Sequence, residues 1–225
     1  MTRFPTLAPF IAFALAVTLA PAPAPAQTLA TDAAPNFWFA GTRLTFERPQ
    51  SKNGQLAVAS DDSGLGRFLQ KLGATLSYQP GQSYVVVTTG DRRTVTFAIG
   101  DPHYVVAGVT QTASFAPYAI RGAAYVPFAE LARALDVTPV GDGGATVLEP
   151  QIASLEVRPL GRITVVTLRG ASPLHFKRLT SDGDALLTLA FSGISSTLER
   201  NRQIAGAGLQ NLAITAGGTP RNPRT

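Results

Sequence analysis

The chain lacks cysteine entirely and has only two histidines, one methionine and one tryptophan among its 225 residues. Without cysteine there is no disulfide and no thiol for lipid attachment, so each domain must be stable through its own hydrophobic core. His103 and His175 lie in different segments, and neither has an acidic residue or a second histidine at the helical spacing of metal ligands. We therefore expect no metal ion and no other cofactor.

Charge of either sign is also sparse, with 19 Lys and Arg against 14 Asp and Glu and a formal net charge of +5. The basic residues are scattered, and such a distribution argues against nucleic acid as a partner. Beyond the N-terminal region no apolar run approaches the roughly 20 residues that cross a bilayer. We expect no transmembrane segment in the mature chain.

The N-terminal region has the three parts of a secretory signal peptide: Arg3, the apolar run Phe10–Leu19, and small residues that end in Ala24-Pro25-Ala26. The apolar run is too short for a membrane anchor, and prolines interrupt its end. We predict that residues 1–26 are removed by cleavage between Ala26 and Gln27. The protein is then exported to the periplasm or another extracytoplasmic location, with residues 27–35 as a linker.

An internal repeat is the most informative pattern in the mature chain. Its first copy has apolar residues at helical spacing, preceded by the capping candidates Asp61 and Asp62, and the same spacing recurs 63 residues later. The two sets are Leu65, Phe68, Leu69 and Leu72, and Phe128, Leu131, Ala132 and Leu135. The shift continues from Thr75 to Thr138 and from the strand starting at Tyr84 to one starting at Val147. Each copy is predicted to form a strand, a loop, a helix and then two strands joined by a tight turn.

Strands and hairpins are predicted between the two helices. Tyr84–Thr89 and Thr94–Ile99 are rich in β-branched and aromatic residues and are joined by the turn Gly90–Arg93. A proline pushes the preceding residue into an extended conformation and fits the first turn of a helix. Val126 should therefore finish a buried strand, and Pro127 should open the second helix.

The segments Gly100-Asp101-Pro102, Val105–Gly108 and Arg121–Ala132, centred on Tyr125-Val126-Pro127-Phe128, resemble a known family. It is the stalk domain named after the N-terminal domain of copper amine oxidases, and the resemblance covers about residues 36–150. Glu130 stands close to where the family often has a basic residue. In the namesake enzymes the metal chemistry belongs to another domain, so the resemblance implies a fold and not a copper site.

The pattern changes after Pro150, where Ile152–Val157, Ile163–Leu168 and Leu186–Phe191 are predicted strands. The stretches Leu155–Val157, Thr164–Leu168, Ala185–Gly193 and Gly208–Ile214 resemble the AMIN domain. That module precedes N-acetylmuramoyl-L-alanine amidases and also occurs in secretin-type outer-membrane pores. We predict a partial AMIN-like domain over residues 151–214, followed by a disordered tail over residues 215–225.

Catalytic signatures are lacking. Ser172, His175 and Asp182 are the ingredients of a triad, but no Gly-x-Ser-x-Gly elbow surrounds Ser172. Asp182 and Asp184 are better explained by a turn around Gly183 than by a calcium loop. The zinc ligands of an amidase are also missing from the sequence. We expect no enzymatic activity from these 225 residues, and whether a further domain follows Thr225 stays open.

The densest group of basic residues in the last segment is the candidate binding site. It consists of Arg158, Arg162, Arg169, Lys177 and Arg178. Arginine holds carboxylates in bidentate fashion, so this group could bind the peptides of peptidoglycan, although it could equally be an ordinary solvated strand face. Trp38, between Phe37 and Phe39, could stack on a sugar ring, or the aromatic run could belong to the core.

The sequence thus predicts an exported, β-rich α+β protein with a duplicated strand-helix-strand-strand stalk-like domain over residues 36–150 and a small AMIN-like β-sandwich over residues 151–214. The leading hypothesis is a non-catalytic protein that binds or targets peptidoglycan or another cell-wall polymer, with other envelope proteins as further candidate partners. The alternatives are the N-terminal targeting portion of a wall amidase and a structural component of a secretin-type complex. Coding sequence downstream of Thr225 would separate these three.

Overall fold

The computed structural model describes residues 36–171, 173–180, 187–196, 198, 201–203 and 211–225. The predicted signal peptide and linker lie outside the described residues, as do Ser172 and the predicted turn Ser181–Asp184. Within the described part the chain is β-rich with two helices, α1 (Ser63–Lys71) and α2 (Phe128–Ala134). None of the described helices has the length and hydropathy to cross a membrane.

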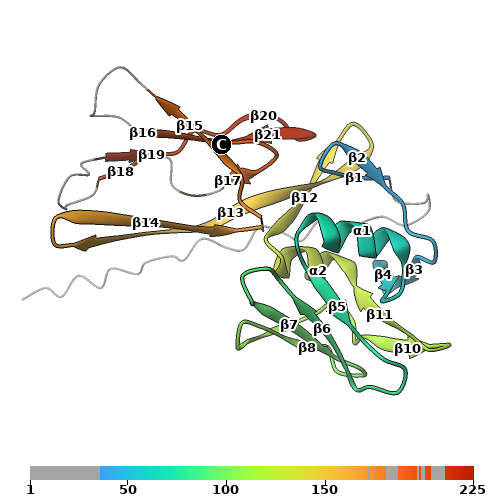
Figure 1. The fold of residues 1–225 in the computed structure, drawn as a ribbon. Coiled ribbons are helices and arrows are strands. Elements are labelled where there is room, and N and C mark those ends of the chain that lie inside the picture. The colour runs from blue at the N-terminus through green and yellow to red at the C-terminus, as the bar shows by residue number, and fades with distance from the viewer. Residues whose placement is uncertain (1–35, 172, 181–186, 197, 199–200, 204–210) are drawn as a thin grey trace, which may run out of the picture.

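Three sheets surround the two helices (Figure 1). The first has the order β5 (Thr75–Ser77), β6 (Tyr84–Thr88), β7 (Thr94–Ala98), β8 (His103–Val106) and β9 (Val109–Thr112). The second has the order β10 (Tyr118–Ile120), β11 (Ala123–Pro127), β4 (Gln55–Ala59) and β3 (Gln50–Lys52). The third contains β12 (Val137–Asp142), β13 (Ala145–Leu160), β1 (Phe37–Phe39) and β2 (Thr42–Leu44), and β14 (Ile163–Gly170) and β17 (Ser195–Ser196) also pair with β13.

Both helices lie where the apolar spacing predicted them. The four apolar residues of each predicted set are buried. Their spacing places them on one face of a helix, and burial of that face favours a helix over a strand. Phe68 of α1 and Phe128 of α2 are in edge contact, with ring centroids 5.3 Å apart. Phe37, Phe39 and Phe46 complete an aromatic cluster with them, and this cluster ties β1 and both helices into one core.

The start of α2 follows the predicted role of its proline with a shift of one position. Val126 is fully buried in β11. Pro127 is the last residue of that strand and the N-cap of α2, with φ −68° and ψ 109°, and the helix begins at Phe128. The fixed φ of proline suits this junction, and the missing backbone N–H costs nothing at a helix start.

Each helix is followed by an antiparallel pair of strands, β5–β6 after α1 and β12–β13 after α2. Their registers differ. Thr75 lies opposite Thr88, whereas Thr138 lies opposite Glu149 and not opposite Gln151, as a constant shift of 63 residues requires. The predicted equivalence of Tyr84 with Val147 is therefore wrong, because the second hairpin is two residues shorter. The duplication of the whole unit stays a prediction.

One strand, β13, crosses the predicted boundary between residues 150 and 151. Its first half pairs in parallel with β1 and antiparallel with β12. Its second half forms a hairpin with β14 (Figure 1). This hairpin projects from the helical body, by which we mean residues 36–150 with α1, α2 and the strands around them. The two predicted domains thus share a continuous backbone element.

The C-terminal part consists of short hairpins next to β14. They are β15 (Phe176–Thr180) with β16 (Leu187–Phe191), β18 (Asn201–Gln203) with β19 (Asn211–Ala213), and β20 (Gly217–Thr219) with β21 (Asn222–Arg224). A small apolar cluster joins the β13–β14 hairpin to β16. Ile152, Phe191 and Ile194 are buried in it, and half-buried leucines from both hairpins pack against them.

The predicted disorder of residues 215–225 is wrong. Strands β20 and β21 form a hairpin there, and the backbone N–H of Phe191 donates to the carbonyl of Thr225 (2.6 Å) while that of Thr225 donates back (3.1 Å). Pro223 is buried, and its carbonyl accepts from Gly193 N–H (2.8 Å). Backbone hydrogen bonds to β16, which is distant in the chain, hold this segment in place, so it needs no alternation of apolar residues. For this reason its composition resembles that of a linker.

Candidate binding surface

Three of the five basic residues predicted to bind lie on the β13–β14 hairpin. Arg158 is opposite Val165, and Arg169 is opposite Ser154. Residues directly opposite in an antiparallel pair share a face, and side chains alternate along each strand. Arg158 and Arg169 therefore lie on the same face, while Arg162 is in the turn beyond Leu160. We call this the hairpin face; its members are Ser154, Glu156, Arg158, Leu160, Ile163, Val165, Thr167 and Arg169.

The two arginines of the hairpin face differ in their partners. The guanidinium of Arg158 is 2.6 Å from the carboxylate of Glu156, and both side chains are exposed. An ion pair this exposed contributes at most about 1 kcal/mol, so Arg158 can exchange this partner for an external carboxylate at little cost. Arg169 makes no ion pair with any described residue. Within the described part of the chain, the hairpin face thus presents one guanidinium without an ion-pair partner and one that is loosely held.

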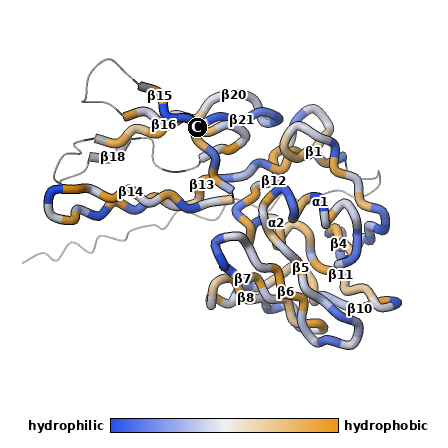
Figure 2. Tube along the Cα trace, viewed as in Figure 1, coloured by the Kyte–Doolittle hydropathy of each residue, from blue (hydrophilic) through white to orange (hydrophobic). Residues whose placement is uncertain are grey.

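Large aliphatic side chains on the same face are exposed to solvent. The exposed fractions are 57% for Leu160, 61% for Ile163 and 39% for Val165. Figure 2 shows hydrophobic and hydrophilic residues alternating along this hairpin to its tip. Monomeric proteins seldom expose neighbouring aliphatic side chains in such a group, and those that do commonly use them for binding.

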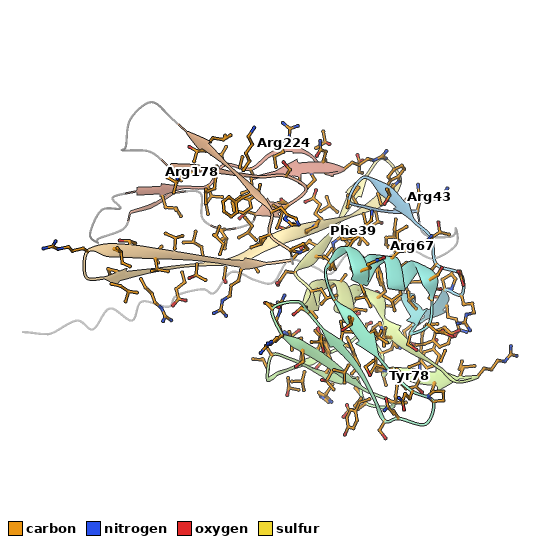
Figure 3. The ribbon with its side chains drawn as sticks, in the orientation of Figure 1. Phe39, Arg43, Arg67, Tyr78, Arg178 and Arg224 are labelled. Carbon is orange, nitrogen blue, oxygen red and sulfur yellow. The ribbon has the colours of Figure 1, made fainter. Side chains whose placement is uncertain are left out.

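The structure does not bring all five basic residues together. Lys177 and Arg178 belong to β15, where Lys177 lies opposite Ala190 and Arg178 opposite Leu189. Because the two are consecutive in a strand, their side chains point to opposite sides of the sheet. Figure 3 places Arg178 on the β15–β16 hairpin, apart from β13–β14. The candidate surface is therefore reduced to Arg158 and Arg169, with Arg162 at the tip.

The aromatic run around Trp38 belongs to the core through its two phenylalanines, whereas Trp38 itself lies outside the core. Phe37 and Phe39 are buried in the core, while Trp38 is half-buried on the opposite face of β1. The guanidinium carbon of Arg221, in the turn between β20 and β21, lies 4.6 Å from the centre of the indole ring. Arg221 Nε also donates to Asp142 Oδ2 at 2.8 Å. An arginine of the same chain thus stacks on the indole ring, a contact that the sequence did not indicate. Stacking of Trp38 on a sugar stays a prediction.

A hollow of about 380 Å³ lies where the helical body meets the C-terminal hairpins. Its lining is largely apolar, with Phe39, Leu72 and Ile194 among the side chains, and Lys71 and His175 are its basic groups. Lys71 Nζ donates to Thr42 Oγ1 at 2.7 Å. Of the triad ingredients only His175 falls within the described residues, where it is exposed. No three His, Asp or Glu side chains in the described part of the chain converge as metal ligands would.

Comparison with known proteins gives a family match that covers most of the helical body. Neither the curated proteins nor the solved structures give a match. The resemblance drawn from the Tyr125–Phe128 motif is confirmed for the first part of the chain, while no comparison shows an AMIN domain in the second. Residues 41–148, which include both helices and the strands from β2 to β12, match the family model of the copper amine oxidase N-terminal domain.

Proposed function

We propose that the protein is a non-catalytic component of the bacterial cell envelope that is exported to the periplasm and binds peptidoglycan through the hairpin face. The observation that carries this proposal is the position of Arg158 and Arg169 on one exposed strand face, beside exposed aliphatic side chains. The family model that matches residues 41–148 describes a non-catalytic domain. Such a domain is consistent with a role in binding.

The chemistry of the hairpin face fits the peptide part of the wall polymer. Stem peptides of peptidoglycan carry carboxylates, and a guanidinium can hold a carboxylate with two parallel N–H···O bonds. The same polymer has methyl groups on its alanines and N-acetyl substituents, which can cover exposed Leu160, Ile163 and Val165. The hairpin face can therefore make both charged and apolar contacts with the polymer.

We further propose that residues 151–214 form an AMIN-like β-sandwich. In its support, the half-buried Leu168 of β14 and Leu189 of β16 pack against one buried cluster, as residues from two facing sheets would. This arrangement leaves the hairpin face on the outer side of the sandwich. The helical body would then act as a stalk that separates the binding module, residues 151–214, from the predicted linker at residues 27–35.

Co-sedimentation of the mature chain with purified sacculi tests the proposal. Replacing both Arg158 and Arg169 with Glu should weaken binding about tenfold or more, because each lost charged hydrogen bond contributes about 1.5 kcal/mol or more. The matched control is Arg43→Glu, which makes the same change at an exposed arginine of β2 (Figure 3). If the double variant sediments as fully as the wild type, or if the control loses as much binding, the hairpin face is not the binding surface.

A further inference from the structure

The hollow of about 380 Å³ between the helical body and the C-terminal hairpins has an apolar floor. Buried side chains from both parts of the chain form this floor: Phe39 (labelled in Figure 3), Leu72, Ala171 and Ile194. The volume is at the lower end of the range found for small-molecule sites, which are concave, largely apolar and equipped with a few polar groups. The hollow thus has the size and the lining of a site for a small ligand with an apolar part.

The charged side chain on the rim of the hollow is a lysine. Lys71 ends α1 and is exposed, as is His175 on the other side, and no Asp or Glu lines the hollow in the part of the chain that the structure describes. Lys71 Nζ donates to the neutral hydroxyl of Thr42 at 2.7 Å. Its ammonium forms no ion pair with any described carboxylate. An anion bound in the hollow would therefore meet a cation for which no other anion competes.

The donors around the hollow indicate which anion fits. A lysine is a compact point charge, and one ammonium balances one negative charge. Phosphates carry more charge and are commonly held by arginine forks or by several backbone N–H groups. The backbone N–H of Gly193, which lines the hollow, already donates to the carbonyl of Pro223 (2.8 Å). A single carboxylate therefore fits better than a phosphate, and the hydrocarbon floor favours an aliphatic tail.

We propose that the hollow binds a small aliphatic monocarboxylate, with its carboxylate at Lys71 and its chain on the apolar floor. Phe39 and Leu72 belong to the helical body, whereas Ala171 and Ile194 belong to the C-terminal part. The ligand contacts both parts and stabilises the arrangement in which they meet, because it binds that arrangement alone. This proposal does not depend on peptidoglycan binding, since the hollow and the hairpin face have no residue in common.

The test uses isothermal titration calorimetry of the mature chain with octanoate, octan-1-ol and octylammonium, which share an alkyl chain and differ in charge. Octanoate should bind with a Kd of about 1 mM or lower, as expected for a ligand of this size in a matching site. Octylammonium should bind at least about tenfold more weakly, because it meets Lys71 with like charge. The proposal is overturned if octanoate does not bind or if the three probes bind equally.

Lys71→Met tests the charge, because methionine keeps an unbranched apolar side chain without the ammonium. It should weaken octanoate binding about fivefold, the factor that an exposed ion pair supplies, and leave octan-1-ol binding unchanged. Lys71→Arg should retain most of the octanoate affinity. The matched control is Lys177→Met, at an exposed lysine of β15 that does not line the hollow. No loss in Lys71→Met, or an equal loss in Lys177→Met, would contradict the proposal.

Ser192→Phe tests the position of the ligand. Ser192 is exposed on the rim, so the added ring can fill the hollow and should abolish binding of octanoate and octan-1-ol alike. Hydrogen exchange adds an independent readout, in which octanoate should slow exchange of the amides of Leu72 and Gly193, one from each part of the chain. Octanoate binding that survives Ser192→Phe, or protection confined to one part, would place the ligand elsewhere and overturn the proposal.

Discussion

At the scale of single residues, Asp62 has more partners than any other described carboxylate. Its Oδ1 accepts from the N–H groups of Gly64 (2.8 Å) and Leu65 (3.4 Å), as expected of a helix N-cap. Its Oδ2 accepts from the N–H groups of Glu47 (2.8 Å) and Arg48 (3.0 Å), which follow the core residue Phe46. One buried side chain therefore fixes the start of α1 and the segment that leads to it.

Replacing Asp62 with Ala should lower the free energy of unfolding by about 2–4 kcal/mol, because the helix cap is lost and two further amide donors are left without an acceptor. Asp62→Asn should cost less, since the amide oxygen still caps the helix while its NH₂ group faces Glu47 and Arg48. Urea unfolding of the mature chain measures both. Asp61→Ala is the control: Asp61 forms an exposed ion pair with Arg48, worth at most about 1 kcal/mol. Equal losses for Asp61 and Asp62 would contradict this account.

The same residue scale shows why only part of the binding surface was predictable. Composition was enough to find the basic residues, but their grouping depends on register, and a slip of one residue moves every side chain to the other face. The predicted strand Ile152–Val157 ends before Pro159, whereas β13 continues to Leu160, which pairs with Ile163, so the turn is Gly161-Arg162. Arg162 therefore leaves the strand, and only Arg158 and Arg169 share a face.

At the scale of elements, the helices were predictable and β13 was not. Each helix has an apolar face of its own, which the sequence displays at the helical period. The continuity of β13 depends on partners that are remote in the chain, such as β1, which pairs with it in parallel. Pro150 suggested a boundary because proline interrupts most strands, yet here it lies within β13, opposite Val137.

Glu149 makes this element sensitive to pH. It is buried in β13, and burial raises the pKa of its carboxyl above the usual value, while hydrogen bonds with Ser195 and Gln151 act in the opposite direction. Because the folded pKa exceeds the unfolded one, the folded state binds more protons between the two values. The stability of the protein should therefore fall as pH rises through that interval.

Glu149→Gln should remove this dependence. The variant should gain stability relative to the wild type as pH rises through the interval. The difference should shrink in acid, where the Glu149 carboxyl of the wild type is protonated in both the folded and the unfolded state. Urea unfolding at a series of pH values from about 4 to 8 measures it. Glu156→Gln, at an exposed position of the same strand, is the control and should show little change. A difference between Glu149→Gln and wild type that is constant across this range would mean that Glu149 is not the titrating group.

At the scale of the whole molecule, two of the connections seen among the described residues join the C-terminal hairpins to the helical body. The first is β13, which both parts share. The second is the β20–β21 hairpin, bonded to β16 through Phe191 and Thr225 and in contact with the helical body through Arg221. The partners Arg221 and Asp142 are 79 residues apart, a distance at which no local pattern reveals a contact.

Arg221→Ala should release this second connection and uncover Trp38. Stacking of an arginine on a half-buried aromatic ring and a surface ion pair each contribute about 0.5–1 kcal/mol, so global stability should fall by no more than about 2 kcal/mol. Trp38 is the only tryptophan of the chain, and acrylamide quenching of its fluorescence should increase. Arg221→Lys should lie in between, because it keeps the charge without the planar group that stacks on the ring.

Arg224→Ala provides the matched control, because Arg224 is an exposed arginine of the same hairpin (Figure 3). It should leave the quenching of Trp38 unchanged. Hydrogen exchange adds an independent readout: the amides of Phe191, Gly193 and Thr225, whose hydrogen bonds hold the hairpin on β16, should exchange faster in Arg221→Ala than in Arg224→Ala. If Arg221→Ala changes neither quenching nor exchange, backbone pairing with β16 alone holds the hairpin, and the contact of Arg221 with Trp38 and Asp142 adds nothing to the joining of the two parts.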